Sequence, residues 1–531
     1  MSFLAQAPAK RVLALHGWSG TLLGLLLYVV IITGTISVFA LELGQWAAGR
    51  EQVRAPLAQP LDSRLRELAS EVDKEYQEEL FVYAMSDGAI YAFFHAHVEK
   101  DTGQVAEKGV RFILSPEDGA VIQRDEGFAD ELPDYAPSAL AHFITELHIN
   151  LHAPQPWGLF ATGVLGLSML IAVISGILLH KHLIKELLVN PRKSSFLLNR
   201  RDRHVLAGTW SLPFGFLLAF TGTFYSFAGS VTLPVVAYVA FGGDQEKMIE
   251  ALIASDLAED DTATEIGNID SMIADSMARS GAAPTYLFIQ KWGRQDALVQ
   301  IQSHVDEQKL TGQLHRYAGA TGEHLGLKPL VGNEPSLGNT VLALVAPLHF
   351  GNFAGLLSKI VWFSLGIALC YVTLTGLQLW TARRADDPTW AWLERGVMVV
   401  GYGTGIAMAG AGIAFFPGLS NDAASAYTNY GFIGASVLAI VLGLTVRDRE
   451  RLAQALRFVL GAALILLPVA RILFGGDGWA TLFEQRSLLI VGMDIALLAG
   501  GALSLAMVRR PTAVAAKANE TRAKGALGAT G

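Results

Sequence analysis

Long apolar stretches separated by polar segments dominate the pattern of this 531-residue chain. A transmembrane helix needs about 20 mostly apolar residues to cross a hydrocarbon layer of ~30 Å. Eight stretches meet this requirement and predict eight such helices, over residues 15–40, 157–180, 205–229, 357–380, 393–416, 429–446, 454–474 and 487–508. The first is longer than the apolar region of a signal peptide, so we expect a retained helix.

Composition supports a membrane protein, since 52% of the residues are apolar and 17% are charged, whereas about 25% are charged in soluble proteins. Such a chain has more apolar surface than its own interior can bury, so lipid must cover part of it. The single cysteine, Cys370, excludes an intrachain disulfide and the covalent attachment of a c-type haem through C-x-x-C-H.

Basic residues gather on one side of the predicted helices. They precede the first helix, fill the connection between the second and third, and follow the fourth, sixth and eighth; they are Lys10, Arg11, Lys181, Lys185, Arg192, Lys193, Arg200, Arg201, Arg203, Arg383, Arg384, Arg447, Arg449, Arg451, Arg509 and Arg510. Because basic loops stay on the cytoplasmic side, both termini and these loops are expected to be cytoplasmic.

Two long polar segments, residues 42–150 and 230–346, then face outward. Both alternate polar and apolar residues around turn signals such as Ser86-Asp87-Gly88 and Gly319-Ala320-Thr321-Gly322. The predicted fold is therefore a membrane all-α protein with two external α+β domains. Its parts are helix one (10–41), the first domain (42–150), helices two and three (151–229), the second domain (230–346), helix four (347–385), four further helices (386–510) and a disordered tail (511–531).

The core also shows an internal duplication. Two pairs of segments match, His16 to Thr35 with His204 to Thr223, and Gly166 to Gly176 with Gly366 to Gly376. Residues 10–180 and 200–380 therefore each form a helix–domain–helix unit. Chance similarity between apolar helices rich in glycine and threonine is the alternative.

Six histidines near the predicted helix ends form two layers once this topology is applied. The cytoplasmic layer holds His16, His180 and His204, and the outer layer holds His148, His152 and His349. Neutral imidazoles from facing helices are good axial ligands for the iron of a b-type haem.

The duplication favours the ligand pairs His16–His204 and His148–His349. The second helix is expected to run from His148 to His180, so His152 lies one turn beyond His148 and is an alternative ligand. His180 is a further candidate. An interfacial histidine bonded to a neighbour is the alternative, and we prefer it for His182.

In order and spacing, these residues resemble the PepSY-associated transmembrane family, which includes inner-membrane reductases of ferric siderophores. The matching pieces are Leu15-His16-Gly17-Trp18, Leu147 to His152, Ser175 to Lys181, Arg203 to Gly208 and Leu348-His349-Phe350-Gly351. The resemblance covers about residues 10–385. It implies PepSY-like periplasmic domains, one or two haem b groups in a bacterial inner membrane, and reduction of a ferric siderophore or another ferric chelate.

The cytoplasmic connections are too short to hold a nicotinamide or flavin domain. Gly401-Tyr402-Gly403-Thr404-Gly405 lies in an apolar helix and follows no strand, so it is not a dinucleotide motif. Electrons are therefore expected from a quinol or a separate cytoplasmic reductase, and no nucleic-acid partner is expected. Candidate contacts for the chelate are Tyr83, Tyr91, His95, His97 or Tyr135. His95 and His97 share one face of a strand, and a solvated strand face is the default interpretation for them.

The last four helices have no role in this scheme. Arg471, Asp477 and Asp494 near their ends are compatible with either assembly or quinone access. A transporter, and a non-catalytic regulator that binds a partner through its outer domains, are the rival hypotheses for the whole chain.

Overall fold

The structure is a computed structural model that describes residues 6–49, 55–101, 105–180, 191–192, 196–244, 247–248, 251, 257–303, 310–329 and 336–508. The chain divides into two compact units. The helical unit comprises residues 1–50, 139–227 and 361–531, and the sheet unit comprises residues 51–138 and 228–360.

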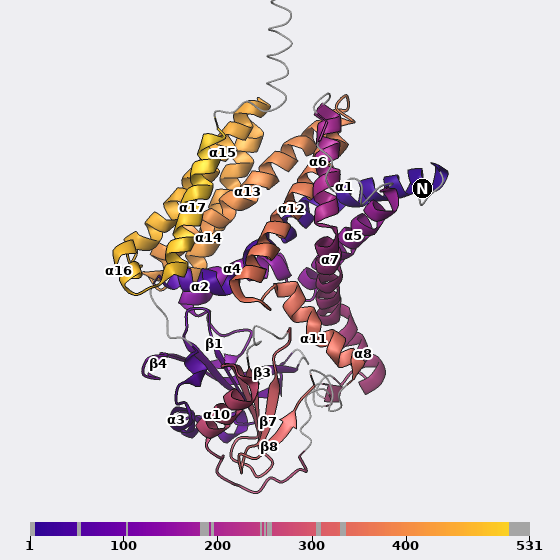
Figure 1. Cartoon of the computed structure of the whole chain (residues 1–531). Helices are drawn as coiled ribbons and strands as arrows, with labels where there is room; N and C mark the ends of the chain where they lie inside the picture. Colours follow the sequence, from indigo (N-terminus) through magenta and orange to yellow (C-terminus); the bar gives the residue numbers. More distant parts are fainter. Residues whose placement is uncertain are drawn as a thin grey trace, which may run out of the picture. The chain divides into compact units, whose positions relative to one another are not determined.

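Among the residues that the structure describes, eight helices are long and apolar enough to cross a membrane, which confirms the predicted number. They are α1 (Gln6–Ser37), α5 (Trp157–Leu179), the stretch of α7 (Leu212–Phe227), η4 (Ala228–Thr232) and α8 (Leu233–Phe241), α12 (Gly355–Ala382), α13 (Pro388–Leu419), α14 (Ala424–Thr445), α15 (Arg449–Leu473) and α17 (Leu488–Ala506). Helices suit a bilayer because all their backbone groups pair internally. Helices α13, α14, α15 and α17 lie side by side (Figure 1).

The third span begins later than predicted. A separate helix, α6 (Phe196–Trp210), carries the basic residues, and the chain turns at Ser211 before α7 starts. Pro213 is the second residue of α7, where a missing backbone N–H costs nothing because the first turn has no intrahelical acceptor for it.

The prediction of one helix from His148 to His180 is wrong. The short helix α4 (Ala139–Ile149) ends just after His148, and α5 starts afresh at Trp157. Between them Leu151 and His152 adopt positive φ angles of 57° and 54°. Pro154 and Pro156 follow in this connection and disfavour a continuous helix, because proline lacks a backbone donor and its ring clashes with the preceding turn.

Three further short helices adjoin the spanning helices in the sequence. Helix α2 (Ala40–Ala48) follows α1, α11 (Leu337–Phe350) precedes α12, and α16 (Trp479–Glu484) precedes α17.

The sheet unit contains eight antiparallel strands in the order β4-β3-β2-β1-β5-β6-β7-β8. They are β1 (Glu79–Ala84), β2 (Ile90–Glu99), β3 (Val105–Leu114), β4 (Val121–Phe128), β5 (Pro284–Gln290), β6 (Leu298–Ser303), β7 (Leu314–Ala318) and β8 (His324–Leu327). The sequence predicts a separate domain for each of the two polar segments. In the structure each segment supplies four strands, and the pairing of β1 with β5 joins them into one sheet.

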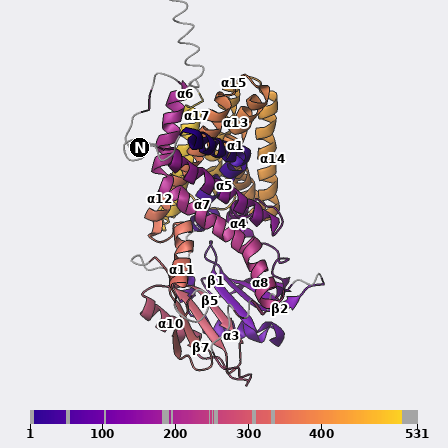
Figure 2. The ribbon, with the colours of Figure 1, turned by 90° about the vertical axis from the view of Figure 1, so that its right-hand side faces the viewer.

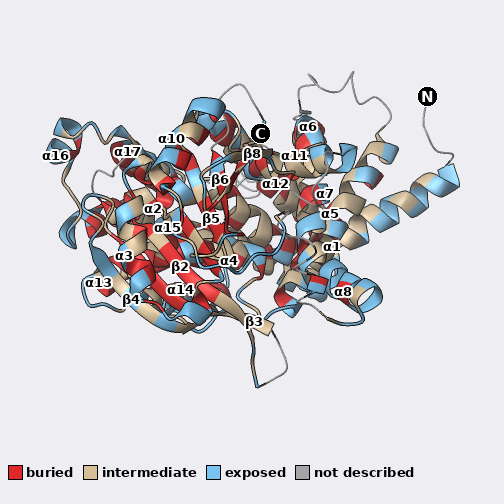
Figure 3. Ribbon diagram, turned by 90° about the horizontal axis from the view of Figure 1, so that it is seen from below, coloured by how far each residue is buried: buried red, intermediate tan, exposed pale blue. Residues whose placement is uncertain are grey.

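One face of this sheet forms the core of the unit. Alternate residues such as Leu80, Val82 and Ile289 are fully buried there (Figure 3), as expected for strands whose side chains alternate between faces. Helices α3 (Asp62–Ser70) and α10 (Ile269–Ser280) cover this face with Leu65 and Ile273 (Figure 2).

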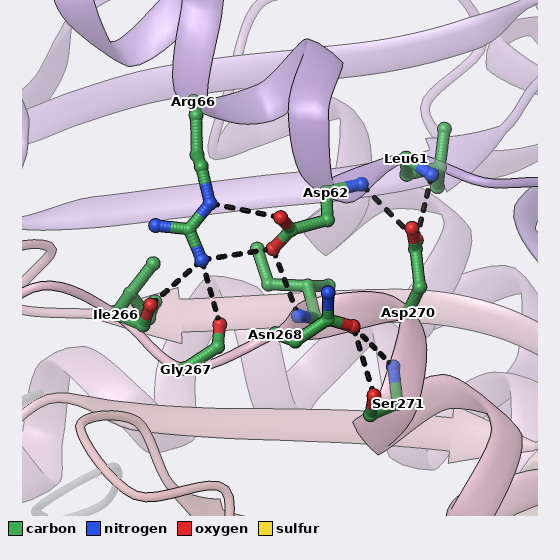
Figure 4. A network of polar contacts seen from close by, with 9 residues as sticks. Leu61, Asp62, Arg66, Ile266, Gly267, Asn268, Asp270 and Ser271 are labelled. Atoms are coloured by element: carbon green, nitrogen blue, oxygen red, sulfur yellow. Dashed lines mark hydrogen bonds and ion pairs between the residues drawn. The ribbon is translucent and has the colours of Figure 1, made fainter.

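Helices α3 and α10 cap each other at their N-termini (Figure 4). The Asp62 carboxylate accepts the backbone N–H of Ile269 at 2.9 Å, and the Asp270 carboxylate accepts those of Leu61 and Asp62 at 2.7 and 3.0 Å. Arg66 donates to Asp62 and to the carbonyl of Ile266. Because the first N–H groups of a helix lack intrahelical acceptors, this exchange ties the two segments together.

Candidate functional site

His16 and His204 lie together in the helical unit. The Nδ1–H of His16, on α1, donates to the Ala172 carbonyl of α5 at 3.0 Å, and Ser175 Oγ lies at 3.0 Å. The Nδ1–H of His204, on α6, donates to the carbonyl of residue 372 in α12 at 3.1 Å, and the hydroxyl of residue 375 lies at 3.2 Å. The two ring centroids are 6.4 Å apart and the ring planes are inclined by 76°.

The contacts of the two histidines occur at positions that the sequence comparison aligns. Residues 172 and 372 both accept through their carbonyls, and residues 175 and 375 both offer a hydroxyl. Glycine follows in each case. A Cβ at Gly176 would lie 3.7 Å from Cε1 of His16, and one at Gly376 would lie 3.2 Å from Cε1 of His204. Gly376 therefore leaves room for the His204 imidazole, whereas the 3.7 Å distance at Gly176 is an ordinary contact.

Both imidazoles are held in one tautomer. A carbonyl oxygen only accepts, so each Nδ1 carries a proton, and in the neutral imidazole each Nε2 then carries a lone pair. Within the described residues, the hydrogen bonds of the two rings leave both Nε2 atoms without a partner. The helical unit therefore offers two neutral imidazoles whose Nε2 lone pairs can coordinate a metal ion.

His148 is anchored in the same way. Its Nδ1–H donates to the Val30 carbonyl of α1 at 2.9 Å. A Cβ at Gly34 would lie 2.5 Å from Cε1 of this ring and 2.7 Å from Nδ1. The glycine of the Thr-Gly-Thr motif thus accommodates the imidazole, which the sequence alone did not indicate.

The other predicted histidines are placed differently. His152 lies in the turn after α4, with its ring centroid 4.3 Å from that of Phe143, so the predicted shared helix face with His148 is wrong. His180 is the residue after α5, and its Nε2 lies 3.4 Å from Thr209 Oγ1. His349 lies near the end of α11, in the sheet unit, and its pairing with His148 stays a prediction. His182 falls outside the described residues.

The face of the sheet opposite the core carries a row of three tyrosines. Tyr83 on β1 pairs in register with Tyr91 on β2 and Tyr286 on β5, and the rings of Tyr83 and Tyr91 stack at 4.5 Å. Burial raises the pKa of all three phenols. Arg111 only partly opposes this shift at Tyr83 and Tyr91, so the hydroxyls remain protonated donors at neutral pH. Tyr286 was not among the predicted contacts, because register between distant strands is not visible in the sequence.

His95 and His97 lie on this face too, which confirms that they share one side of a strand. The His95 ring is fully buried and stacks at 4.8 Å on Phe93 and at 4.9 Å on Phe81. Its Nε2 lies 3.2 Å from Glu79 Oε2. Tyr135, the fifth predicted contact, packs against Tyr91. Within the described ranges, no three His, Cys, Asp or Glu side chains are grouped closely enough to hold a metal ion.

Arg471 and Asp494, noted separately in the sequence, form a fully buried ion pair. Arg471 Nη2 donates to Asp494 Oδ2 at 2.6 Å, and Nη1 donates to the Asp477 carbonyl at 2.9 Å. The indole N–H groups of Trp46 and Trp479 donate to the two oxygens of Asp494 at 2.8 and 2.9 Å. Every oxygen of this buried carboxylate is therefore paired, which a buried charge requires.

Comparison with known proteins adds a family assignment. The family model described as the PepSY-associated TM region matches residues 13–383. The chain is also 26% identical over 258 residues to an uncharacterised protein of Pseudomonas aeruginosa. That alignment covers 46% of this chain and 64% of the relative, so the chain spans a little under two thirds of the relative's length. Helices α13, α14, α15 and α17 lie beyond the matched region.

Proposed function

Because this chain belongs to the PepSY-associated transmembrane family, we propose that it is a haem b electron carrier of the bacterial inner membrane that reduces a ferric siderophore or another ferric chelate on the periplasmic side. The observation that carries the proposal is the pair His16 and His204, each fixed through Nδ1 and each with Nε2 available. The basic loops argue that this pair lies toward the cytoplasm.

The geometry of the pair fits haem ligation. His16 and His204 would hold the haem iron through their Nε2 atoms, and their ring centroids are 6.4 Å apart. The carbonyls of residues 172 and 372 then act as the outer partners that hold ligand orientation. When bound there, haem supplies a one-electron carrier.

His148 is proposed as a ligand of a second, outer haem. Its Nδ1–H bond to Val30 sets the same tautomer as in the inner pair. The internal duplication pairs it with His349. Recurring contacts support that duplication, since Thr223 Oγ1 would lie 2.6 Å from a Cβ at Gly166 and Thr35 meets the equivalent Gly366.

The tyrosine row of the sheet unit is proposed to bind the chelate. Three protonated phenols present hydrogen-bond donors to an oxygen-rich ligand, whereas the charge of the nearby Arg111 is already paired with Asp125. Hard oxygen ligands prefer Fe(III) to Fe(II). One electron that converts bound Fe(III) to Fe(II) therefore loosens the complex. The electron comes from a quinol or a cytoplasmic reductase.

The visible spectrum of the purified chain tests this function. We expect a Soret band and an α-band that sharpens with dithionite, and reoxidation when a ferric siderophore is added. His16→Ala and His204→Ala should lower the haem content, and His148→Ala should remove a distinct part of it. His142→Ala is a matched control, because His142 is exposed on the same helix as His148.

Two results would contradict the proposal. A colourless wild-type protein, purified from cells that make excess haem, would remove the carrier and favour a non-catalytic regulator or a transporter. Haem that no ferric chelate reoxidises would remove the reductase assignment and leave only haem binding.

A further inference from the structure

Helix α4 is held between two groups of helices. His148 points to α1, where it bonds Val30. Phe143 precedes His148 by five residues, which places it about 140° away around the helix axis at 3.6 residues per turn. The ring centroid of Phe143 is 5.1 Å from that of Phe432 on α14. The candidate ligand and this aromatic contact therefore occupy different sides of one short helix.

A second contact joins α4 to the same group. A Cβ at Gly412 of α13 would lie 3.8 Å from Leu140 Cδ2, so Leu140 packs over this glycine. Leu140 and Phe143 are 2% and 7% exposed. Leu140 and Phe143 of α4 are thus covered by α13 and α14, which follow the family region in the sequence.

Helices α1 and α2 also contact the C-terminal helices. Trp46 of α2 is 1% exposed, donates to Asp494 of α17, and has its ring 5.3 Å from that of Phe416 on α13. Tyr28 of α1 donates to the Gly401 carbonyl of α13 at 2.8 Å. The C-terminal helices therefore contact α1, α2 and α4, the three helices around His148.

We propose that the four C-terminal spanning helices form a positioning scaffold for α4, and that Phe432 and the Asp494–Arg471 pair are its positioning residues. The scaffold keeps the His148 imidazole against Val30 and Gly34. The effect of this scaffold on haem ligation by His148 rests on the proposed function. Its effect on the position of α4 is independent of the proposed function.

Amide hydrogen exchange of α4 in the full-length protein in detergent tests the mechanical part. Phe432→Ala should speed exchange of the α4 amides by about tenfold or more, because the contact with Phe143 is lost. Phe458→Ala is the matched control, since Phe458 is 57% exposed on α15. Equal exchange of α4 in the two variants would overturn the inference, whether or not the protein binds haem.

The spectroscopic part uses the haem signal that His148→Ala removes. Phe432→Ala should shift the midpoint potential or low-spin electron paramagnetic resonance signal of that haem and leave the signal lost in His16→Ala unchanged. Phe432→Leu should restore much of the wild-type behaviour. If Phe432→Ala does not fold, Trp46→Phe takes its place; it keeps an aromatic ring but removes the N–H bond to Asp494 and part of the buried indole. A shift of both haem signals, or of neither, would overturn the scaffold as a specific support of His148.

Discussion

Replacing Gly34 by alanine tests the anchoring of His148 most directly. The new methyl carbon would lie 2.5 Å from Cε1, 2.7 Å from Nδ1 and 3.0 Å from Nε2 of the imidazole. Ordinary contacts between such atoms are about 3.5 Å, so the ring must move by about 1 Å. The 2.9 Å bond from Nδ1 to the Val30 carbonyl would then exceed hydrogen-bonding distance.

The expected cost follows from these distances. Overpacking costs about 1–3 kcal/mol, and loss of the hydrogen bond costs about 1 kcal/mol. The higher helix propensity of alanine stabilises the folded state by about 1 kcal/mol. The net loss of stability is therefore about 1–3 kcal/mol.

Gly20→Ala is the matched control on the same helix. A Cβ at Gly20 has no neighbour within 4 Å among the described residues, so only the propensity gain applies. Thermal unfolding of both variants in detergent, with the haem spectrum recorded before heating, compares them. We expect Gly34→Ala to melt below the wild type and to perturb the haem signal that depends on His148, while Gly20→Ala melts at or above it. Identical melting and identical spectra for the two variants would refute the packing of His148 on Gly34.

Three further predictions concern the sheet unit. Asp296 is buried between Lys291 and Arg294; burial opposes its ionisation, but these cations lower its pKa from 3.8 to about 2. Its contribution of about 2 kcal/mol is present above pH 4 and is lost as the pH falls through 2, so Asp296→Asn should flatten the acid end of an unfolding-versus-pH curve. Asp62→Ala should destabilise the sheet unit by about 1 kcal/mol or more, because the first N–H of α10 at Ile269 loses its acceptor. A denaturant titration measures this change, and a midpoint equal to wild type would contradict the exchange of caps. Tyr91→Phe, which keeps the stacked ring, should weaken ferric-chelate binding several-fold in a fluorescence titration. An unchanged affinity would contradict binding of the chelate at the tyrosine row.

The sequence was sufficient for the features that depend on consecutive residues. Eight apolar stretches predicted eight spanning helices, and all eight are present. The alternation around Ser86-Asp87-Gly88 predicted β1 and β2, and the turn at residues 319–322 joins β7 to β8. The pairs His16–Thr35 and His204–Thr223 led to two histidines whose rings are neighbours in the structure.

Only the tertiary structure decided the features that depend on distant contacts. Register between β1 and β5 merges the two polar segments into one sheet and brings Tyr286 beside Tyr83. The break after α4 separates His148 from α5. Hydropathy records how each residue partitions between water and an apolar phase. Pairing of strands, helix breaks and the direction of an imidazole depend instead on which partners the folded chain brings within hydrogen-bonding distance.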